Sequence, residues 1–120
     1  MKYVIIDTET TGLNPEDGHE VIEFGAIVLI DGLVTEKLEL KIQPDNISGA
    51  SPEAMRINGY NEYKWRYALP QKQAAKMIWA FIESHRDGIS VGHNLNFDKK
   101  FIEALGRKNE IPIKISMPCM

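Results

Sequence analysis

The first third of the chain carries the patterns of β-strands. Residues 2–7 form a short apolar run rich in β-branched side chains, which predicts a buried strand. A second strand is predicted over residues 21–30, after a loop that contains glycine, proline and asparagine. Asp31-Gly32 is typical of a two-residue hairpin turn, and residues 34–42 then mostly alternate apolar with polar side chains. We therefore expect three antiparallel strands at the start of the domain.

The middle of the chain changes to helical spacing. Ser51 as a cap and Pro52 at the first helical position predict a short helix, which Asn58-Gly59 ends. A longer helix is predicted over residues 70–84 because its apolar side chains fall on one stripe. The stripe consists of Ala74, Met77, Ile78, Phe81 and Ile82.

The last third predicts a strand, a helix and the start of another strand. A short strand at residues 89–91 leads to a third helix, capped by Asn94 or Asn96, that ends at Gly106. Residues 111–117 are expected to begin a fifth strand. The predicted class is α/β, with a mixed sheet of three antiparallel strands followed by the order α-β-α-β. A final strand with no helix after it would leave the fold incomplete at its C-terminal end.

Composition fits an ordinary globular domain. The chain has 120 residues, of which 43% are hydrophobic and 26% charged. Its longest apolar run, residues 26–30, is too short to span a membrane. The single cysteine, Cys119, cannot form an internal disulfide. A cytoplasmic location is the default expectation.

Charge is distributed unevenly along the chain. Residues 1–50 contain three Lys or Arg and ten Asp or Glu, whereas residues 51–120 contain eleven and seven. An acidic half beside a basic half suits a metal site next to a phosphate-binding surface. Charge alone favours ordinary surface variation over this interpretation.

Two carboxylates at the first strand are candidates for metal binding. Asp7 and Glu9 are two residues apart, so in a strand both side chains project from the same face. Adjacent carboxylates repel unless a cation lies between them. Carboxylate oxygens are ligands that Mg²⁺ or Mn²⁺ prefers. The alternative is a solvated strand end, where acidic residues are common.

A third carboxylate follows the predicted strand at residues 89–91. Asp98 falls in the first turn of the next helix, where the helix dipole by itself favours a negative charge. That explanation covers Asp98 alone. It does not explain why this motif occurs in the same chain as the strand that carries Asp7 and Glu9.

These motifs resemble a known family. The segment Asp-Thr-Glu-Thr-Thr-Gly-Leu at residues 7–13 is similar to the first motif of the DEDD exonucleases, in the subgroup with a catalytic histidine. Gly-His-Asn-Leu-Asn-Phe-Asp at residues 92–98 is similar to the second motif. Residues 20–26 and 51–59 resemble the second strand and the first helix of that family. The resemblance implies a ribonuclease H-like fold.

The resemblance also implies an activity and its ligands. It predicts a metal-dependent 3′→5′ exonuclease that hydrolyses phosphodiester bonds with two Mg²⁺ or Mn²⁺ ions. Asp7 would bridge the two ions, with Glu9 on one and Asp98 on the other. The implied partner is a single-stranded or frayed 3′ end of DNA or RNA.

Four further residues are implied to bind substrate. Thr8 and Thr10 would hold the terminal nucleotide through backbone amides and a hydroxyl. Leu13 would wedge against the last base, or else pack on the core as a loop residue. Asn58 stands where the family often has a histidine, and would either touch the substrate strand or serve as a helix-end residue.

The chain departs from the family after Asp98. The family's third motif supplies a histidine and, five residues later, a fourth metal-binding aspartate, whereas no Asp or His follows Asp98 here. Residues 1–120 are therefore expected to be an exonuclease domain without its C-terminal strand and helix, and inactive or nearly so alone. His93 is expected to be structural, bonded to backbone at its turn. The alternatives are a non-catalytic module that binds a nucleic-acid end or a protein, and a homodimer that covers the open sheet.

One loop combines aromatic and basic side chains. Residues 63–67 read Tyr-Lys-Trp-Arg-Tyr. Such a segment can stack on bases and pair with phosphates. It is also what a loop pinned by its own aromatic cluster looks like, and this interpretation is slightly favoured.

Overall fold

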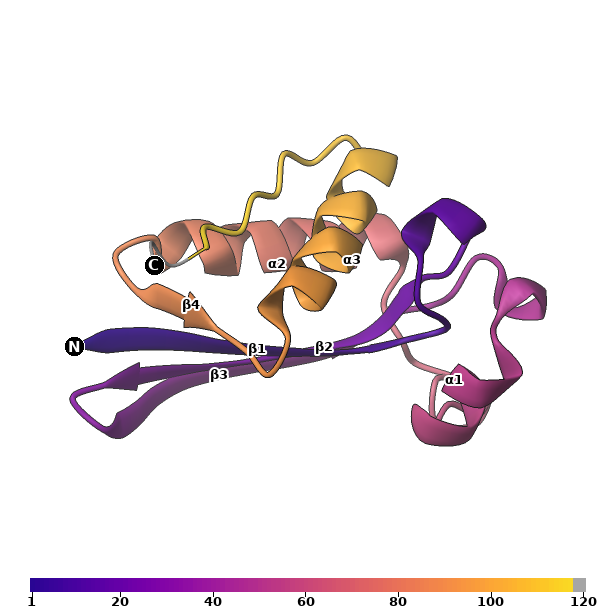
Figure 1. Ribbon diagram of the computed structural model, residues 1–120, viewed down its shortest axis with the longest axis horizontal. Helices are drawn as coiled ribbons and strands as arrows, with labels where there is room; N and C mark the ends of the chain where they lie inside the picture. The colour runs from indigo at the N-terminus through magenta and orange to yellow at the C-terminus, as the bar shows by residue number, and fades with distance from the viewer. Residues whose placement is uncertain (118–120) are drawn as a thin grey trace.

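A four-stranded mixed sheet forms the centre of the molecule (Figure 1). The computed structural model describes residues 1–117. The strands are β1 (Lys2–Thr10), β2 (Val21–Ile30), β3 (Leu33–Lys41) and β4 (Ile89–Val91), in the spatial order β3-β2-β1-β4. β1, β2 and β3 pair antiparallel, and β4 pairs parallel to β1. The α/β class and the three antiparallel strands predicted from the sequence are confirmed.

β1 continues past its predicted end at Asp7. The apolar run stops there, but the backbone goes on pairing with β2 as far as Thr10, with an irregularity between Glu9 and Thr10. Asp7 and Glu9 therefore lie within a paired strand and not in the loop beyond it. Their positions are fixed by backbone hydrogen bonds on the β2 side.

The helices fall into two groups. α2 (Gln71–Ser84) and α3 (Leu95–Lys108) cover one face of the sheet. α1 (Pro52–Ile57) lies beyond the end toward which β1 runs, with Ser51 as its cap (Figure 1). Two short 3₁₀ turns, η1 (Pro15–Asp17) and η2 (Ile47–Gly49), lie in the connections. None of the helices in residues 1–117 has the length and apolar character needed to cross a membrane.

The core lies between the sheet and α2 and α3. Alternate side chains of the strands point toward the helices, as the burial of Val4 and Ile6 in β1 illustrates. They pack against Ile78 from α2 and Phe101 from α3, each 1% exposed or less. The opposite face of β1 and β2 carries Asp7 and Glu9, and α2 and α3 do not cover it.

The predicted fifth strand is wrong for the residues that the structure describes. Residues 111–117 have no regular secondary structure and run back over the helices (Figure 1). Ile113 and Ile115 are buried in the same core, and the Ile115 N–H donates 3.0 Å to the Glu103 carboxylate instead of to a strand. Gly106 permits this path because a Cβ there would lie 2.6 Å from the Ile111 carbonyl oxygen. Cys119 lies outside the described residues.

Candidate metal and substrate site

The open face of the sheet presents a row of carboxylates. Asp7 pairs with Gly25 across β1 and β2, and Glu9 pairs with Glu23. Gly25 has no side chain, so the surface between Asp7 and Glu39 is hollowed, with a volume of about 230 Å³. The residues that line it are Ile5, Asp7, Thr8, Glu9, Glu23, Gly25, Ala26, Ile27 and Glu39.

This face is electrostatically unbalanced. Burial, Asp7, Glu23 and Asp98, in that order, raise the pKa of the Glu9 carboxyl above its ordinary value. One cation compensates part of this charge: the Lys41 ammonium lies 3.5 Å from the Glu23 carboxylate. A cation bound beside Glu9 would offset this repulsion.

Asp98 reaches β1 from the opposite side. It lies in the first turn of α3, is 6% exposed, and accepts a hydrogen bond from the Thr8 hydroxyl. Gly92 allows the turn before α3 to lie close to β1. A Cβ at position 92 would be 2.9 Å from the Ile6 carbonyl oxygen and 3.4 Å from an Asp98 carboxylate oxygen. The β4–α3 turn can thus lie directly against β1.

Burial and charge both act on Asp98. Burial raises the pKa of the Asp98 carboxyl, the Thr8 hydrogen bond opposes that shift, and the Asp7 charge adds to it. Thr8 and Asp7 are neighbours in a strand, so their side chains leave β1 on opposite faces. Asp98 therefore approaches the acidic row from the helix side.

The donor set suits a hard divalent cation. Asp7, Glu9 and Asp98 offer carboxylate oxygens, the ligands that Mg²⁺ and Mn²⁺ prefer. Besides burial, the Asp7 charge raises the pKa of both Glu9 and Asp98. Within residues 1–117 no three His, Cys, Asp or Glu side chains lie close enough together to enclose an ion. The ligands fit in kind, and a bound ion would have to draw Asp98 toward Asp7 and Glu9.

The four residues implied to bind substrate differ in what their side chains do. The Thr8 hydroxyl donates to Asp98, and the buried Thr10 hydroxyl donates 2.8 Å to the Gly12 carbonyl oxygen. Asn58 is also buried: its amide donates 3.0 Å to the Thr10 carbonyl oxygen and its oxygen accepts from the Tyr60 N–H. Leu13 is 69% exposed and packs on no core. Among these four side chains, Leu13 is the one that stands free.

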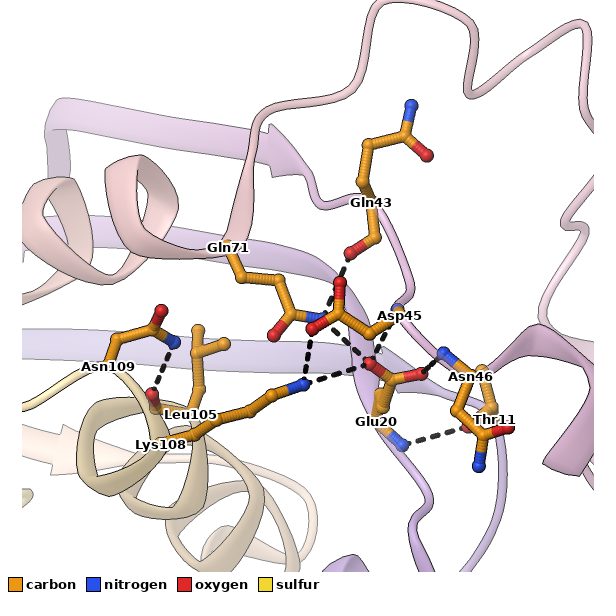
Figure 2. Close-up of polar contacts among 9 residues, drawn as sticks. All are labelled: Thr11, Glu20, Gln43, Asp45, Asn46, Gln71, Leu105, Lys108 and Asn109. Atoms are coloured by element: carbon orange, nitrogen blue, oxygen red, sulfur yellow. Dashed lines mark hydrogen bonds and ion pairs between the residues drawn. The ribbon is translucent and has the colours of Figure 1, made fainter.

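The loop between β1 and β2 is held by Glu20 (Figure 2). Its carboxylate accepts from the backbone N–H groups of Asp45 and Asn46, each at 2.8 Å, and from the Gln71 side-chain amide at 2.6 Å. The Lys108 ammonium lies 3.6 Å away. Sequence reasoning gave Glu20 no such role, and no local signal marks it, because its partners come from distant segments.

Two other features of the face were also missed. Glu23 and Glu39 join the acidic hollow because the strand register places them beside Glu9 and Gly25. The hairpin at Asp31-Gly32 fixes the strand register, and the period of two fixes the face, so the sequence could have placed Glu23 and Glu39 on the same face as Glu9.

His93 is exposed, and no side-chain hydrogen bond to it occurs within residues 1–117, so the expectation of a backbone-bonded histidine is wrong. The turn instead uses the Asn94 carbonyl, which accepts from the Phe97 N–H.

Comparison with known proteins places these features in a family. Residues 4–116 match the RNase T family model, described as exonuclease. DNA polymerase III subunit epsilon of Rickettsia prowazekii is 34% identical over 105 residues, which cover 85% of this chain and 43% of that protein. The 3′-5′ exonuclease DinG of Bacillus subtilis is 28% identical over 86% of this chain and 10% of its own length.

The fold agrees with the sequence match. E. coli exonuclease I in complex with a dT13 oligonucleotide superposes with a TM-score of 0.77 over 92% of this chain and 24% of that one, at 20% identity. The chain thus spans less than half the length of these relatives. The predicted resemblance to the DEDD exonucleases with a catalytic histidine, and the ribonuclease H-like fold, are both confirmed. With a family match across residues 4–116, the chain belongs to the RNase T family of exonucleases.

Proposed function

We propose that this chain carries the acidic part of a 3′→5′ exonuclease site that hydrolyses phosphodiester bonds of a nucleic-acid end. Asp7, Glu9 and Asp98 are the proposed ligands of two Mg²⁺ or Mn²⁺ ions. The names of the relatives support the reaction type, since they are exonucleases or a polymerase subunit. The dT13 oligonucleotide held by exonuclease I supports a single-stranded substrate.

One observation carries the proposal. Asp7 and Glu9 lie side by side over a hollow that Gly25 leaves open, and the close contact of Gly92 with β1 brings Asp98 toward them. Burial and, after it, the Asp7 charge raise the pKa of both Glu9 and Asp98. Carboxylates kept in mutual repulsion at a surface hollow favour cation binding over a purely structural role.

The protein residues have distinct roles in this proposal. When bound, the two ions supply a hydroxide and stabilise the attacking and leaving oxygens of the phosphodiester. Thr8 orients Asp98 by donating its hydroxyl hydrogen to one carboxylate oxygen. Thr10 and Asn58 brace the end of β1 through their own hydrogen bonds. Leu13 offers an exposed apolar surface to the terminal base.

Hydrolysis by residues 1–120 alone is expected to be slow. No Asp or His follows Asp98 in the sequence, so the chain offers neither the fourth ligand nor the histidine base that the resemblance implies. A positioned acid or base typically contributes about 10²–10⁴-fold in rate. Metal binding is therefore a more direct test of the proposal than turnover.

The test is a calorimetric titration with Mn²⁺ of the wild-type chain and of Asp7→Ala. We expect weak, saturable binding that disappears in Asp7→Ala. Glu16→Ala is the matched control because Glu16 is an exposed acid on the loop that follows β1. It should bind Mn²⁺ as the wild type does. If wild type and Asp7→Ala bind Mn²⁺ equally, or neither binds, the proposal fails and a non-catalytic binding module becomes the better description.

A further inference from the structure

Two exposed tyrosines flank an arginine on the segment between α1 and α2. Tyr63 is 72% exposed and Tyr67 is 85% exposed. The Arg66 guanidinium carbon lies 3.7 Å from the centroid of the Tyr63 ring and 4.9 Å from that of Tyr67. Arg66 also donates 2.6 Å to the Tyr63 carbonyl oxygen. We call Tyr63, Arg66 and Tyr67 the tyrosine–arginine patch.

The patch rests on a rigid base. Trp65, between its members, is 2% exposed, and its indole N–H donates 2.9 Å to the Ile22 carbonyl oxygen of β2. Its own carbonyl accepts from the Gln43 side chain at 2.7 Å. Trp65 thus confirms the interpretation of residues 63–67 as a pinned loop, and the exposed tyrosines remain available for the other interpretation, base stacking.

The patch adjoins the carboxylate row through a short series of contacts. Glu9 pairs with Glu23 across β1 and β2, and Glu23 pairs with Lys41 across β2 and β3. The Lys41 ammonium lies 4.9 Å from the centroid of the Trp65 ring, next in sequence to Arg66. On the other side, Asn58 ties the end of α1 to Thr10 of β1. The segment that carries the patch is therefore linked to the strands that carry Asp7 and Glu9 through Trp65 and Lys41.

The positive charge of the patch, on Arg66, is not neutralised by an acidic side chain. Within residues 1–117, neither Arg66 nor its neighbour Lys64 forms an ion pair. The acidic row beside them would repel phosphates that arrive without a cation. Basic groups next to planar aromatic rings form the combination that binds a single strand, through phosphate contacts and base stacking.

We propose that the tyrosine–arginine patch binds the single strand whose 3′ end enters the carboxylate site. This inference rests on the proposed function and adds a binding surface outside the cluster of metal ligands. Tyr63 and Tyr67 stack on bases, and Arg66 holds the two rings in place while it contacts a phosphate. Because every base has a flat face, such binding tolerates any sequence, whereas paired bases in a duplex keep those faces covered.

The test measures binding without cleavage. Fluorescence anisotropy in EDTA compares a labelled dT12 strand, an rU12 strand and a blunt duplex on the wild type and on the double variant Tyr63→Ala/Tyr67→Ala. Loss of two stacking rings should weaken dT12 binding by roughly tenfold or more. Arg66→Lys keeps the charge but loses the planar group, and should weaken binding by a few-fold. The duplex should bind more weakly than dT12 throughout.

Two control variants match the test substitutions. Trp79→Ala removes another partly exposed aromatic side chain, on α2, and Arg107→Gln removes another exposed arginine, on α3. Both should bind dT12 as the wild type does. All changed side chains are at the surface, so circular dichroism should show folded proteins.

The outcomes separate this inference from the proposed function. Absence of saturable dT12 binding by the wild type, or equal binding by the double variant, overturns the role of the patch whether or not Mn²⁺ binds. If dT12 binding depends on the patch but Asp7→Ala leaves Mn²⁺ binding unchanged, the strand surface stands and the nuclease proposal fails. If the double variant changes only self-association in sedimentation, and not dT12 binding, the surface is a protein contact and the inference is wrong.

Discussion

Two acidic regions on either side of the β1–β2 loop have opposite surroundings. Glu20, at the end of that loop, is met by two backbone N–H groups, one side-chain amide and the Lys108 ammonium (Figure 2). Asp7 and Glu9, before the loop, face Glu23 and Glu39 across a hollow. The Glu20 carboxylate has hydrogen-bond donors and a cation around it, whereas Asp7 and Glu9 have other carboxylates as neighbours.

The difference distinguishes a structural carboxylate from candidate ligands. Glu20 joins the segments around Asp45, Gln71 and Lys108, so its charge contributes to the fold. The charge of Glu9 acts against the fold, because burial and the neighbouring carboxylates raise its pKa. Carboxylates in such surroundings at a hollow are candidates for a functional site.

The largest expected effect comes from removing the satisfied carboxylate. Glu20→Ala leaves two backbone N–H groups and the Gln71 amide without their charged acceptor, and Lys108 keeps only Asp45. We expect a loss of about 3 kcal/mol in the free energy of unfolding, measured by urea denaturation. Glu16→Ala, in the same loop but exposed, should change it by less than about 0.5 kcal/mol. Equal effects of the two substitutions would show that the contacts of Glu20 do not stabilise the fold.

The sequence predicted the fold well where the signals were local. The bounds of β2 and β4 agree with the predicted ranges, because alternation, hairpin residues and glycine lie inside or next to each element. The strand expected at residues 111–117 failed because a strand also needs a partner, and β4 has only three residues. Alternation of Ile111, Ile113 and Ile115 fits an extended segment buried on helices equally well.

The candidate site was predictable in part for the same reason. The period of two places Asp7 and Glu9 on one face, whatever the rest of the fold does. The position of Asp98 depends on a crossover and on the contact at Gly92, which only the resemblance suggested. The hydrogen bond from the Asn58 amide to the Thr10 carbonyl oxygen joins residues far apart in the sequence, so no local pattern predicts it.

The second prediction concerns the close contact between Gly92 and β1. In Gly92→Ala the new Cβ meets the Ile6 carbonyl oxygen at 2.9 Å, so the β4–α3 turn must move away from β1 and carry Asp98 with it. We expect a cost of about 2 kcal/mol in the free energy of unfolding and weaker Mn²⁺ binding. Gly25→Ala is the control for stability alone, since the nearest atom to its new Cβ is the Asp7 carbonyl oxygen at 3.9 Å, an ordinary contact. Unchanged stability and Mn²⁺ binding in Gly92→Ala would show that the turn does not position Asp98.

The smallest effect has the opposite sign and concerns pH. The pKa of Asp98 is raised in the folded protein by burial and by Asp7, so the folded state holds this proton more tightly than the unfolded state. Its contribution to stability is present below the ordinary carboxyl pKa of 3.8 and is lost as the pH rises through the folded value. Asp98→Asn, which can still accept from Thr8, should therefore become more stable than the wild type as pH increases toward neutrality. Urea denaturation at a series of pH values measures the difference between the two proteins.

The control for this titration has a pKa shifted the other way. Lys2 lowers the pKa of Asp87, so the Asp87 contribution is present above the ordinary carboxyl pKa and is lost on acidification. Asp87→Asn should thus be slightly less stable than the wild type at neutral pH and equally stable at low pH. Asp98→Asn should be more stable than the wild type at neutral pH and lose that difference at low pH. Mn²⁺ should narrow the gap between wild type and Asp98→Asn at neutral pH, because a bound cation removes the repulsion. If neither pH nor Mn²⁺ changes the difference in the free energy of unfolding between Asp98→Asn and the wild type, Asp98 has a structural role like that of Glu20.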